Sequence, residues 1–127
     1  KIANGMPGLE TRLPLMFSAM VSEARMGLEA FVELTASAPA RAFGLQSKGQ
    51  IGVGFDADIA LWDASKRMQY GADDLHDNVG YNPFEGHVVV GAPVRVLSRG
   101  QTVVTAGKIC AQAGQGQWLA MLPSSEG

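Results

Sequence analysis

Apolar residues recur with the period of an α-helix through the first third of the chain. The stretch RLPLMFSAMVSEA places them at steps of three and four residues, which gathers them on one helix face. Gly27 interrupts this pattern, and the stretch LEAFVELTAS begins a second apolar face with charged residues on its other side. The pattern therefore predicts helices between Leu9 and Leu45, with a break at Gly27.

A third short helix is predicted in the stretch SAPARAFGL. Ser37 is a residue type that caps helix N-termini, and Pro39 would stand in the first turn, where its missing N–H is tolerated. Gly44 would end the helix, because glycine readily adopts the left-handed conformation found after a last helical turn. These helices are short, and their apolar faces need a partner surface.

After Gln46 the pattern changes to that of strands and tight turns. The stretch DADIALWD predicts a strand, with a glycine-rich turn before it and Asp63 at its end. The stretch HVVVGAPVRVLSRGQTVVTAGKIC alternates short β-branched runs with turn residues, which is typical of a meander or a stack of hairpins. Its turns are expected at Gly91, Gly100 and Gly107. Between the two lies MQYGADDLHDNVGYNPFEG, which predicts an irregular connection.

Composition and charge argue against a disordered protein, a nucleic-acid-binding protein and a membrane protein. With 127 residues, 46% of them hydrophobic, the chain can bury one core and is not expected to be disordered. A net charge of −2 gives no electrostatic reason to expect nucleic acid or an anionic membrane as a partner. We expect no leader, and no apolar run approaches the roughly 20 residues that span a bilayer. A single cysteine, Cys110, allows no internal disulfide and suits the cytoplasm, where we expect the protein.

A dinucleotide-binding loop is the first chemical motif to weigh. The stretch from Gly52 to Ala57, GVGFDA, fits the pattern G-x-G-x-x-A. That motif needs a helix to follow it, because the N–H groups of the helix N-terminus bind the phosphates. Here a predicted strand follows instead, so we interpret the stretch as a glycine turn that leads into a strand.

A metal site is the second possibility. His76 and His87 stand among acidic residues, but they lie eleven positions apart, and histidine ligands usually show short fixed spacings. We therefore interpret both as surface or loop histidines. The acidic residues around them are Asp73, Asp74, Asp77 and Glu85. The group DDLHD is interpreted as an acidic helix start, because general acid–base catalysis needs a pocket that shifts a pKa.

Nucleophilic catalysis finds no better support. Cys110 follows a predicted strand, where a thiol behaves as a small buried hydrophobic group unless a base or a positive dipole activates it. No G-x-S-x-G elbow is present to expose a serine. The residues alone therefore predict no self-sufficient active site.

Several stretches carry a resemblance to a known family. NGMPGLETRLPLMFS, ELTASAPARAFGL, KGQIGVGFDADIALWD, YNPFEG and PVRVLSRGQTVVTAGK occur in this order between about residue 3 and Leu119. They resemble the C-terminal part of cyclic amidohydrolases, specifically the hydantoinase and dihydropyrimidinase branch. The pattern G-x-D-A-D-I is shared across the wider metal-dependent amidohydrolase superfamily, whereas NG-x-PG-x-E-T-R-L-P together with NPFEG is far more specific. Allantoinases share much of both.

The resemblance implies an α+β fragment of a larger fold. Residues 1–46 would supply the last loop and terminal outer helices of a (β/α) TIM-type barrel, and residues 47–112 the C-terminal strands of a small β-sandwich domain. Residues 113–127 would form a C-terminal tail. In this family two zinc ions, or similar divalent metals, are bridged by a carboxylated lysine, and all metal ligands lie upstream of the NG stretch. Of the site residues only Asn4 carries over as a substrate contact, with Gly5 shaping its loop.

The implied reaction is hydrolysis of the ring amide of a dihydropyrimidine or a 5-substituted hydantoin through a metal-bridged hydroxide. The parent protein would be the enzyme, and the 127-residue chain alone is expected to be inactive because it lacks the metal ligands. Two alternatives stay open: an allantoinase, or a non-catalytic dihydropyrimidinase-like protein that serves in assembly. The resemblance also implies a homo-oligomer, with the tail around Trp118 packing against a neighbouring subunit.

Overall fold

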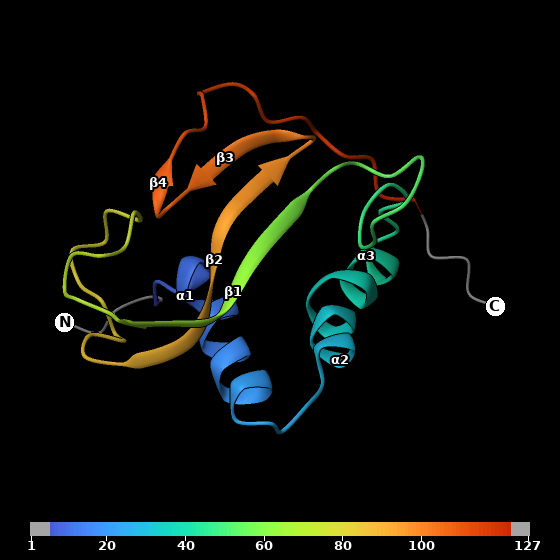
Figure 1. Cartoon of the computed structure of the whole chain (residues 1–127). Helices are drawn as coiled ribbons and strands as arrows, with labels where there is room; N and C mark the ends of the chain where they lie inside the picture. The colour runs from blue at the N-terminus through green and yellow to red at the C-terminus, as the bar shows by residue number, and fades with distance from the viewer. Residues whose placement is uncertain (1–5, 123–127) are drawn as a thin grey trace. The chain divides into compact units, whose positions relative to one another are not determined.

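The structure is a computed structural model in which residues 6–122 are described (Figure 1). The chain divides into two compact units. The first joins the residues up to 25 with residues 63–92, and the second joins residues 26–62 with those from 93 onward. Within the described residues the strands form a sheet in the order β1-β2-β3-β4. No helix in that part of the chain has the length and hydropathy of a membrane span.

The predicted helices are present as two helical stretches. In the first, α1 (Leu9–Phe17) runs directly into a π-helical turn, η1 (Ser18–Ser22). In the second, α2 (Leu28–Val32) continues through the π-helical turn η2 (Glu33–Ser37) into α3 (Ala38–Ala42). The predicted break is confirmed, because Gly27 has an extended backbone and stands at the N-cap of α2.

The prediction of Ser37 as a helix cap is wrong. Its φ of −71° and ψ of −47° are helical, so α3 is the continuation of η2 and not a separate helix. The Ser37 hydroxyl donates a hydrogen bond to the carbonyl of Gly49 (2.7 Å) instead of capping a free N–H group. A contact with a residue twelve positions away thus determines the role of this serine, which local sequence does not reveal.

Both helical stretches end in the same backbone motif. Gly44 has a φ of +63°, its N–H donates to the carbonyl of Arg41, and the N–H of Leu45 donates to that of Ala40. This pair of bonds is the Schellman motif, so the predicted stop at Gly44 is confirmed. Ala24 occupies the equivalent position after η1 with a φ of +55°, although it is not a glycine.

The first strand is longer than predicted. β1 (Ile59–Gln69) continues beyond Asp63, which therefore does not end it. The Asp63 carboxylate accepts the backbone N–H groups of Ser65 (2.9 Å) and Lys66 (3.1 Å) within the strand. The exposed polar continuation has weak strand propensity of its own, and its place beside β2 in the sheet accounts for the extra length.

The remaining strands confirm the predicted meander. β2 (Val88–Ser98) pairs antiparallel with β3 (Gln101–Thr105), which pairs antiparallel with β4 (Lys108–Ile109). Gly100 and Gly107 lie in the two-residue connections, each after another residue with positive φ, as type I′ hairpin turns require. The third predicted turn is wrong, because Gly91 lies inside β2 with a φ of +90°.

The core of the first unit lies where the first helical stretch meets the beginning of β2. Phe17 and Val89 are buried, and the two serines of η1 take up the backbone of Val90. The Ser22 hydroxyl donates to the Val90 carbonyl (2.8 Å), while the Ser18 hydroxyl oxygen accepts the Val90 N–H (3.1 Å). Two serine hydroxyls of the helical stretch thus form the hydrogen bonds to the Val90 N–H and C=O that a neighbouring strand would otherwise form.

The core of the second unit is built around Phe31. Its ring lies edge-on to that of Trp62, with centroids 5.9 Å apart and an interplanar angle of 81°. Ala40 is also buried, and Gly49 approaches it so closely that a Cβ on this glycine would stand 2.5 Å from the Ala40 methyl group. The helical stretch and the following loop are therefore closely packed at this point.

Candidate functional site

The predicted substrate contacts, Asn4 and Gly5, lie outside the described residues. The structure describes the segment that follows them, from Met6 into the first turn of α1. There the carbonyl of Gly8 accepts the N–H of Arg12 (2.9 Å) and the hydroxyl of Thr11 (3.3 Å), and Thr11 is fully buried. The first turn of α1 is thus held by two hydrogen bonds to one carbonyl.

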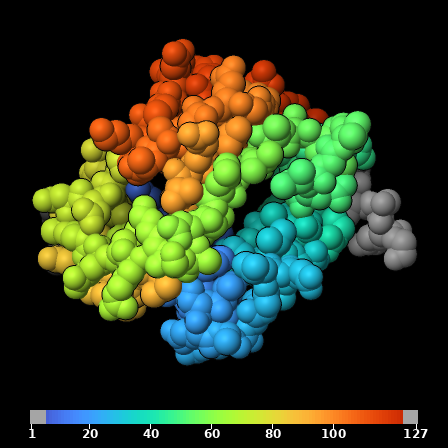
Figure 2. Space-filling view, in the orientation of Figure 1, coloured from blue at the N-terminus to red at the C-terminus, as the bar shows by residue number. Residues whose placement is uncertain are grey.

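The irregular connection was predicted over residues 68–86, but Met68 and Gln69 belong to β1, and residues 70–87 form a loop that is closed at its base. The N–H of Tyr70 donates to the carbonyl of His87 (3.0 Å), and the N–H of Gly86 donates to that of Tyr70 (2.8 Å). We call these residues the 70–87 loop. In the space-filling view its atoms, yellow-green to yellow, pack together as a continuous surface (Figure 2).

Asn82, from the stretch NPFEG, organises the interior of the 70–87 loop. Its side chain is 7% exposed, which is unusual for asparagine. The amide nitrogen donates to the carbonyl of Gly71 (2.8 Å), and the amide oxygen accepts the N–H of Phe84 (2.9 Å). A single side chain therefore joins the two arms of the loop.

Glu10 connects this loop to α1. One carboxylate oxygen accepts the backbone N–H of His76 (3.0 Å), and the other lies 2.9 Å from Nδ1 of the same histidine. Glu10 belongs to the stretch ETRLP and His76 to the group DDLHD, 66 positions later. The two stretches most specific for the resemblance are thus linked through the contacts between Glu10 and His76 and through one loop.

The acidic residues of the 70–87 loop do not begin a helix, so that interpretation is wrong. Asp74 accepts the N–H of Gly71 (2.6 Å), and Asp77 accepts the N–H of Val79 (3.0 Å). Carboxylates commonly satisfy backbone N–H groups in turns in this way. Their role in this structure is to hold two turns of the loop.

The described residues do not fit a binuclear metal centre. Within residues 6–122 no three histidine, cysteine, aspartate or glutamate side chains gather closely enough to hold a metal ion. Nδ1 of His76 is already engaged by Glu10, and the ring of His87 lies edge-on to Phe84 with centroids 6.3 Å apart. Both histidines are therefore used within the loop.

Tyr70 is the most perturbed titratable group of the first unit. Burial raises the pKa of its phenol to about 12, and the negative charges of Glu10 and Asp74 act in the same direction. Sequence reasoning did not select Tyr70, Glu10 or Asn82, although Glu10 and Asn82 stand inside the quoted stretches. For Glu10 and Asn82 the available signal was a polar residue within a specific motif, whereas Tyr70 stands in none of these stretches.

The GVGFDA stretch forms a turn in which the N–H of Phe55 donates to the carbonyl of Gly52 (3.2 Å), and β1 follows it. The interpretation as a glycine turn that leads into a strand is confirmed. The motif carries an ionic cluster: Lys48 Nζ lies 2.9 Å from the Asp56 carboxylate and also binds Asp58. Asp58 in turn accepts the N–H of Arg99 (2.7 Å) in the β2–β3 turn.

These contacts set the charges of the cluster. Burial alone would lower the pKa of Lys48, but its hydrogen bonds with Asp58 and Asp56 outweigh burial and raise it. Burial would likewise raise the pKa of Asp58, yet the hydrogen bonds from Lys48 and the Arg99 amide lower it. The hydrogen bonds of Lys48 and then Ser47 lower the pKa of Asp56. All three groups are charged at neutral pH, which is the behaviour of a structural ion cluster.

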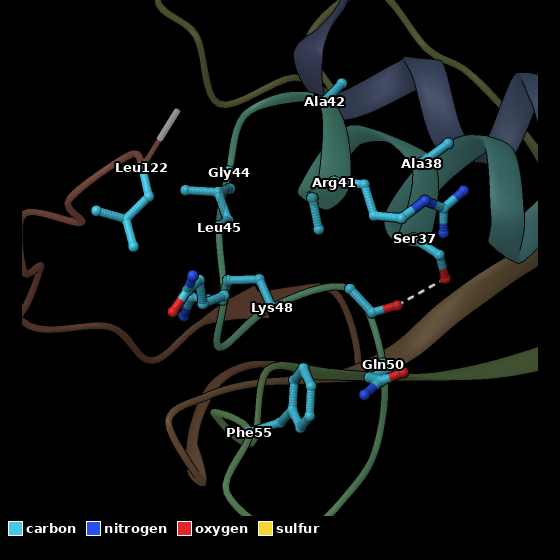
Figure 3. A pocket seen from close by; sticks show the side chains of 13 residues that line it. Ser37, Ala38, Arg41, Ala42, Gly44, Leu45, Lys48, Gln50, Phe55 and Leu122 are labelled. Atoms are coloured by element: carbon cyan, nitrogen blue, oxygen red, sulfur yellow. Dashed lines mark hydrogen bonds between the residues drawn. The ribbon is translucent and has the colours of Figure 1, made fainter. Parts of the chain in front are cut away.

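A hollow of about 670 Å³ in the second unit lies between α3, the loop after it and Leu122 (Figure 3). Its charged side chains already have partners: Arg41 pairs with Glu33, and Lys48 with the two aspartates. A smaller and largely apolar hollow of about 480 Å³ lies at the beginning of α1. It is lined by Met6, Gly8, Leu9, Thr11, Arg12, Leu15, Met16 and Phe84.

Cys110 is exposed, so the expected burial of its thiol is wrong. It follows β4, a strand of two residues, and its Sγ lies 3.6 Å from the carbonyl of Lys108. A strand this short has no covered face on which the thiol could pack.

The comparisons with known proteins agree with one another. A sequence profile of the amidohydrolase family matches residues 18–104. A D-phenylhydantoinase from Escherichia coli O1:K1 is 45% identical over 121 residues, which cover 94% of this chain and 26% of the relative.

Solved structures give the same result. The D-hydantoinase from a Bacillus sp. AR9 superposes with a TM-score of 0.89 at 40% identity, over 97% of this chain and 28% of that chain. The D-hydantoinase (dihydropyrimidinase) from a Thermus sp. gives a TM-score of 0.89 at 36% identity, over 94% and 26%. The chain thus spans about a quarter of the length of the proteins it matches.

Proposed function

This chain belongs to the amidohydrolase family, within its hydantoinase and dihydropyrimidinase type, and we propose that the whole protein hydrolyses the ring amide of a cyclic ureide. The substrate class would be dihydropyrimidines or 5-substituted hydantoins. The observation that carries this proposal is the similarity to a D-phenylhydantoinase along nearly the whole chain. Allantoin hydrolysis is the alternative reaction.

In this proposal Asn4 binds the substrate. An amide side chain offers one acceptor and two donor hydrogens, which match the alternating N–H and C=O groups of a cyclic ureide. Gly5 would let the backbone approach the ring closely, because it has no Cβ. In the sequence both residues stand shortly before α1, whose first turn is held at the Gly8 carbonyl and whose Glu10 binds His76.

The chemistry of bond cleavage is assigned to residues outside this chain. Divalent metal ions, held by other residues of the whole protein, would supply a polarised water, because residues 6–122 do not fit such a centre. We therefore propose that this segment contributes substrate orientation and structure, and that the 127 residues alone do not hydrolyse a ureide.

The proposed architecture assigns residues 1–46 to the outer helices of a TIM-type barrel and residues 47–112 to a β-sandwich. Residues 113–127 would be the tail. The order of the elements, two helical stretches followed by an antiparallel meander, supports this assignment. Exposed apolar side chains on the helices, such as Leu9 and Leu28, support a further layer of protein against them.

The test is hydrolysis by the full-length protein that contains this segment. Dihydrouracil, 5-phenylhydantoin and allantoin would be compared by release of the ring-opened product, with and without a chelator. Turnover of either of the first two above a no-protein control is expected, and turnover of allantoin alone would favour the alternative. No turnover of any of the three would contradict the proposed reaction and favour the non-catalytic relative.

Assembly is a second proposed role, because the tail presents apolar residues to solvent. Trp118 is 86% exposed and Met121 is 65% exposed, although neither side chain gains from contact with water. We propose that this tail packs on another subunit in a cytoplasmic homo-oligomer. Deleting the residues after Gly114 would then lower the number of subunits that sedimentation gives for the assembly, and an unchanged number of subunits would contradict this role.

A further inference from the structure

Gly44 ends the second helical stretch and also touches the C-terminal tail. Its carbonyl accepts the N–H of Leu122 (3.2 Å). A Cβ built on Gly44 would overlap the carbonyl oxygen of Leu122 and stand 2.8 Å from its carbonyl carbon. Leu122 lies beside Gly44 at the edge of the hollow after α3 (Figure 3). The backbone of the tail therefore reaches Gly44 only because this residue has no Cβ.

The positive φ of Gly44 does not by itself require a glycine. Ala24 occupies the equivalent position after η1 with a φ of +55°, close to the +63° of Gly44. The chain thus accepts a Cβ in this backbone conformation, at some cost in strain. The feature that a Cβ at Gly44 would remove is the contact with Leu122.

The beginning of the same tail segment is also bound within the second unit. The guanidinium of Arg99 donates a hydrogen bond to the backbone carbonyl of Gln115, and the N–H of Arg99 donates to Asp58 (2.7 Å). The side-chain oxygen of Gln115 accepts the N–H of Gln112 (2.8 Å). Gln115 is half-buried, whereas the other residues from 111 to 122 are exposed.

Between these two points the segment is held only at its ends. Within the part of the chain that the structure describes, the backbone of residues 116–121 makes no hydrogen bond. Trp118 is 86% exposed and Met121 is 65% exposed, so these side chains do not bury themselves on their own subunit. The contacts of Arg99 and Gly44 therefore determine where this segment lies.

We propose that residues 115–122 form a strap that is fastened to its own subunit, with Arg99 holding its beginning and Gly44 receiving its end. Fastening requires neither the proposed hydrolysis nor a second subunit. It places Trp118 and Met121 on a segment with fixed ends. Such a segment loses less conformational freedom when another subunit covers it, which favours the proposed assembly role.

The first test is hydrogen exchange at the Leu122 amide in the full-length protein. In the wild type we expect exchange at least about tenfold slower than in the unfolded chain, because the N–H is bound to Gly44. Gly44→Asn keeps a residue that tolerates the left-handed conformation but adds a Cβ, so it separates the backbone requirement from the contact. We expect it to speed exchange at Leu122 about tenfold. Unchanged exchange in Gly44→Asn would overturn the proposal.

The matched control for this test is Gly54→Ala. Gly54 has a φ of +89°, and a Cβ there would meet nothing within 4 Å. The substitution therefore strains the backbone of the second unit without touching the strap. Exchange at the Leu122 amide is expected to stay within about twofold of the wild type. An equal acceleration in Gly54→Ala and Gly44→Asn would assign the effect to general destabilisation and overturn the proposal.

The second test is a double-mutant cycle on thermal stability, with Gly44→Ala, removal of the residues from Leu122 onward, and the combination. Removing Leu122 relieves the overlap with the new methyl group. We expect Gly44→Ala to lower the Tm by at least about 2 °C more in the complete chain than in the shortened one. Additive effects of the two changes would overturn the proposal. Absence of turnover by the wild type would contradict the proposed hydrolysis and would leave both measurements on the strap unaffected.

Discussion

Gly91 lies directly against the ring of Phe17. A Cβ built on Gly91 would stand 2.2 Å from Cδ1 of Phe17 and 2.3 Å from Cε1. Gly91 also has a φ of +90°, which L side chains rarely adopt. The glycine therefore lets β2 approach the helix closely enough for Ser18 and Ser22 to bind the backbone of Val90.

We predict that Gly91→Ala destabilises the protein by about 3 kcal/mol. The methyl group would both overpack Phe17 and strain the backbone, and each effect costs about 1–3 kcal/mol. The measurement is the urea midpoint of the full-length protein. Gly116→Ala is the control, because a Cβ at Gly116 meets nothing within 4 Å and is expected to change the midpoint little. Equal midpoints for the two variants would contradict the prediction.

Ala24 is the opposite case, a residue with a side chain where glycine is favoured. It follows η1 with a φ of +55°, its N–H donates to the carbonyl of Val21, and the N–H of Arg25 donates to that of Met20. Ala24→Gly removes the cost of the left-handed conformation, so we predict a gain of about 1 kcal/mol in the free energy of unfolding.

The matched control is Ala30→Gly, at an exposed position inside α2. There glycine has no backbone advantage, and a loss of about 1 kcal/mol is expected from its lower helix propensity. Both variants would be compared with the wild type by thermal denaturation. A lower Tm for Ala24→Gly would show that the conformation of Ala24 is not strained.

The lowered pKa of Asp58 leads to a prediction of how the free energy of unfolding depends on pH. Because the pKa of Asp58 in the folded protein is lowered below the ordinary value of 3.8, its stabilisation is present above pH 3.8 and is lost as the pH falls from there through the lower pKa of the folded state. We expect the urea midpoint of the wild type to fall between about pH 5 and pH 3, and less steeply in Asp58→Asn. At pH 7 the variant should lose about 1 kcal/mol, since the exposed carboxylate is partly screened. Parallel pH profiles would exclude a contribution from Asp58; Asp73→Asn is the control.

Much of this fold follows from the local sequence. The helix break at Gly27, the stop at Gly44 and the turns at Gly100 and Gly107 depend on backbone preferences of single residues, which the sequence states directly. The glycine turn before β1 was predicted for the same reason. Such features need no information about distant residues.

The features that were not predicted depend on long-range contacts. From the sequence alone Gly91 indicates a turn, because the contact with Phe17 that requires a glycine there is not visible in it. Ser37 likewise indicates a helix cap, because the sequence does not show that its hydroxyl donates a hydrogen bond to the Gly49 carbonyl. The link between Glu10 and His76 spans 66 positions and has no local signature. Sequence could therefore identify the motifs of the candidate site but not how they are joined.

Substitutions of Asn82 test whether the stretch NPFEG stabilises the 70–87 loop through the two hydrogen bonds of this side chain. Asn82→Ala leaves the carbonyl of Gly71 and the N–H of Phe84 without their partner, and unsatisfied buried groups cost about 1–3 kcal/mol. We predict a loss of about 2 kcal/mol in the free energy of unfolding and faster amide exchange at Gly86, whose N–H closes the loop base. Asn82→Asp keeps the acceptor for Phe84 but removes the donor to Gly71, so it should not restore stability. An Asp variant as stable as the wild type would mean that the bond to Gly71 contributes nothing, and that the loop is held by its backbone closure alone.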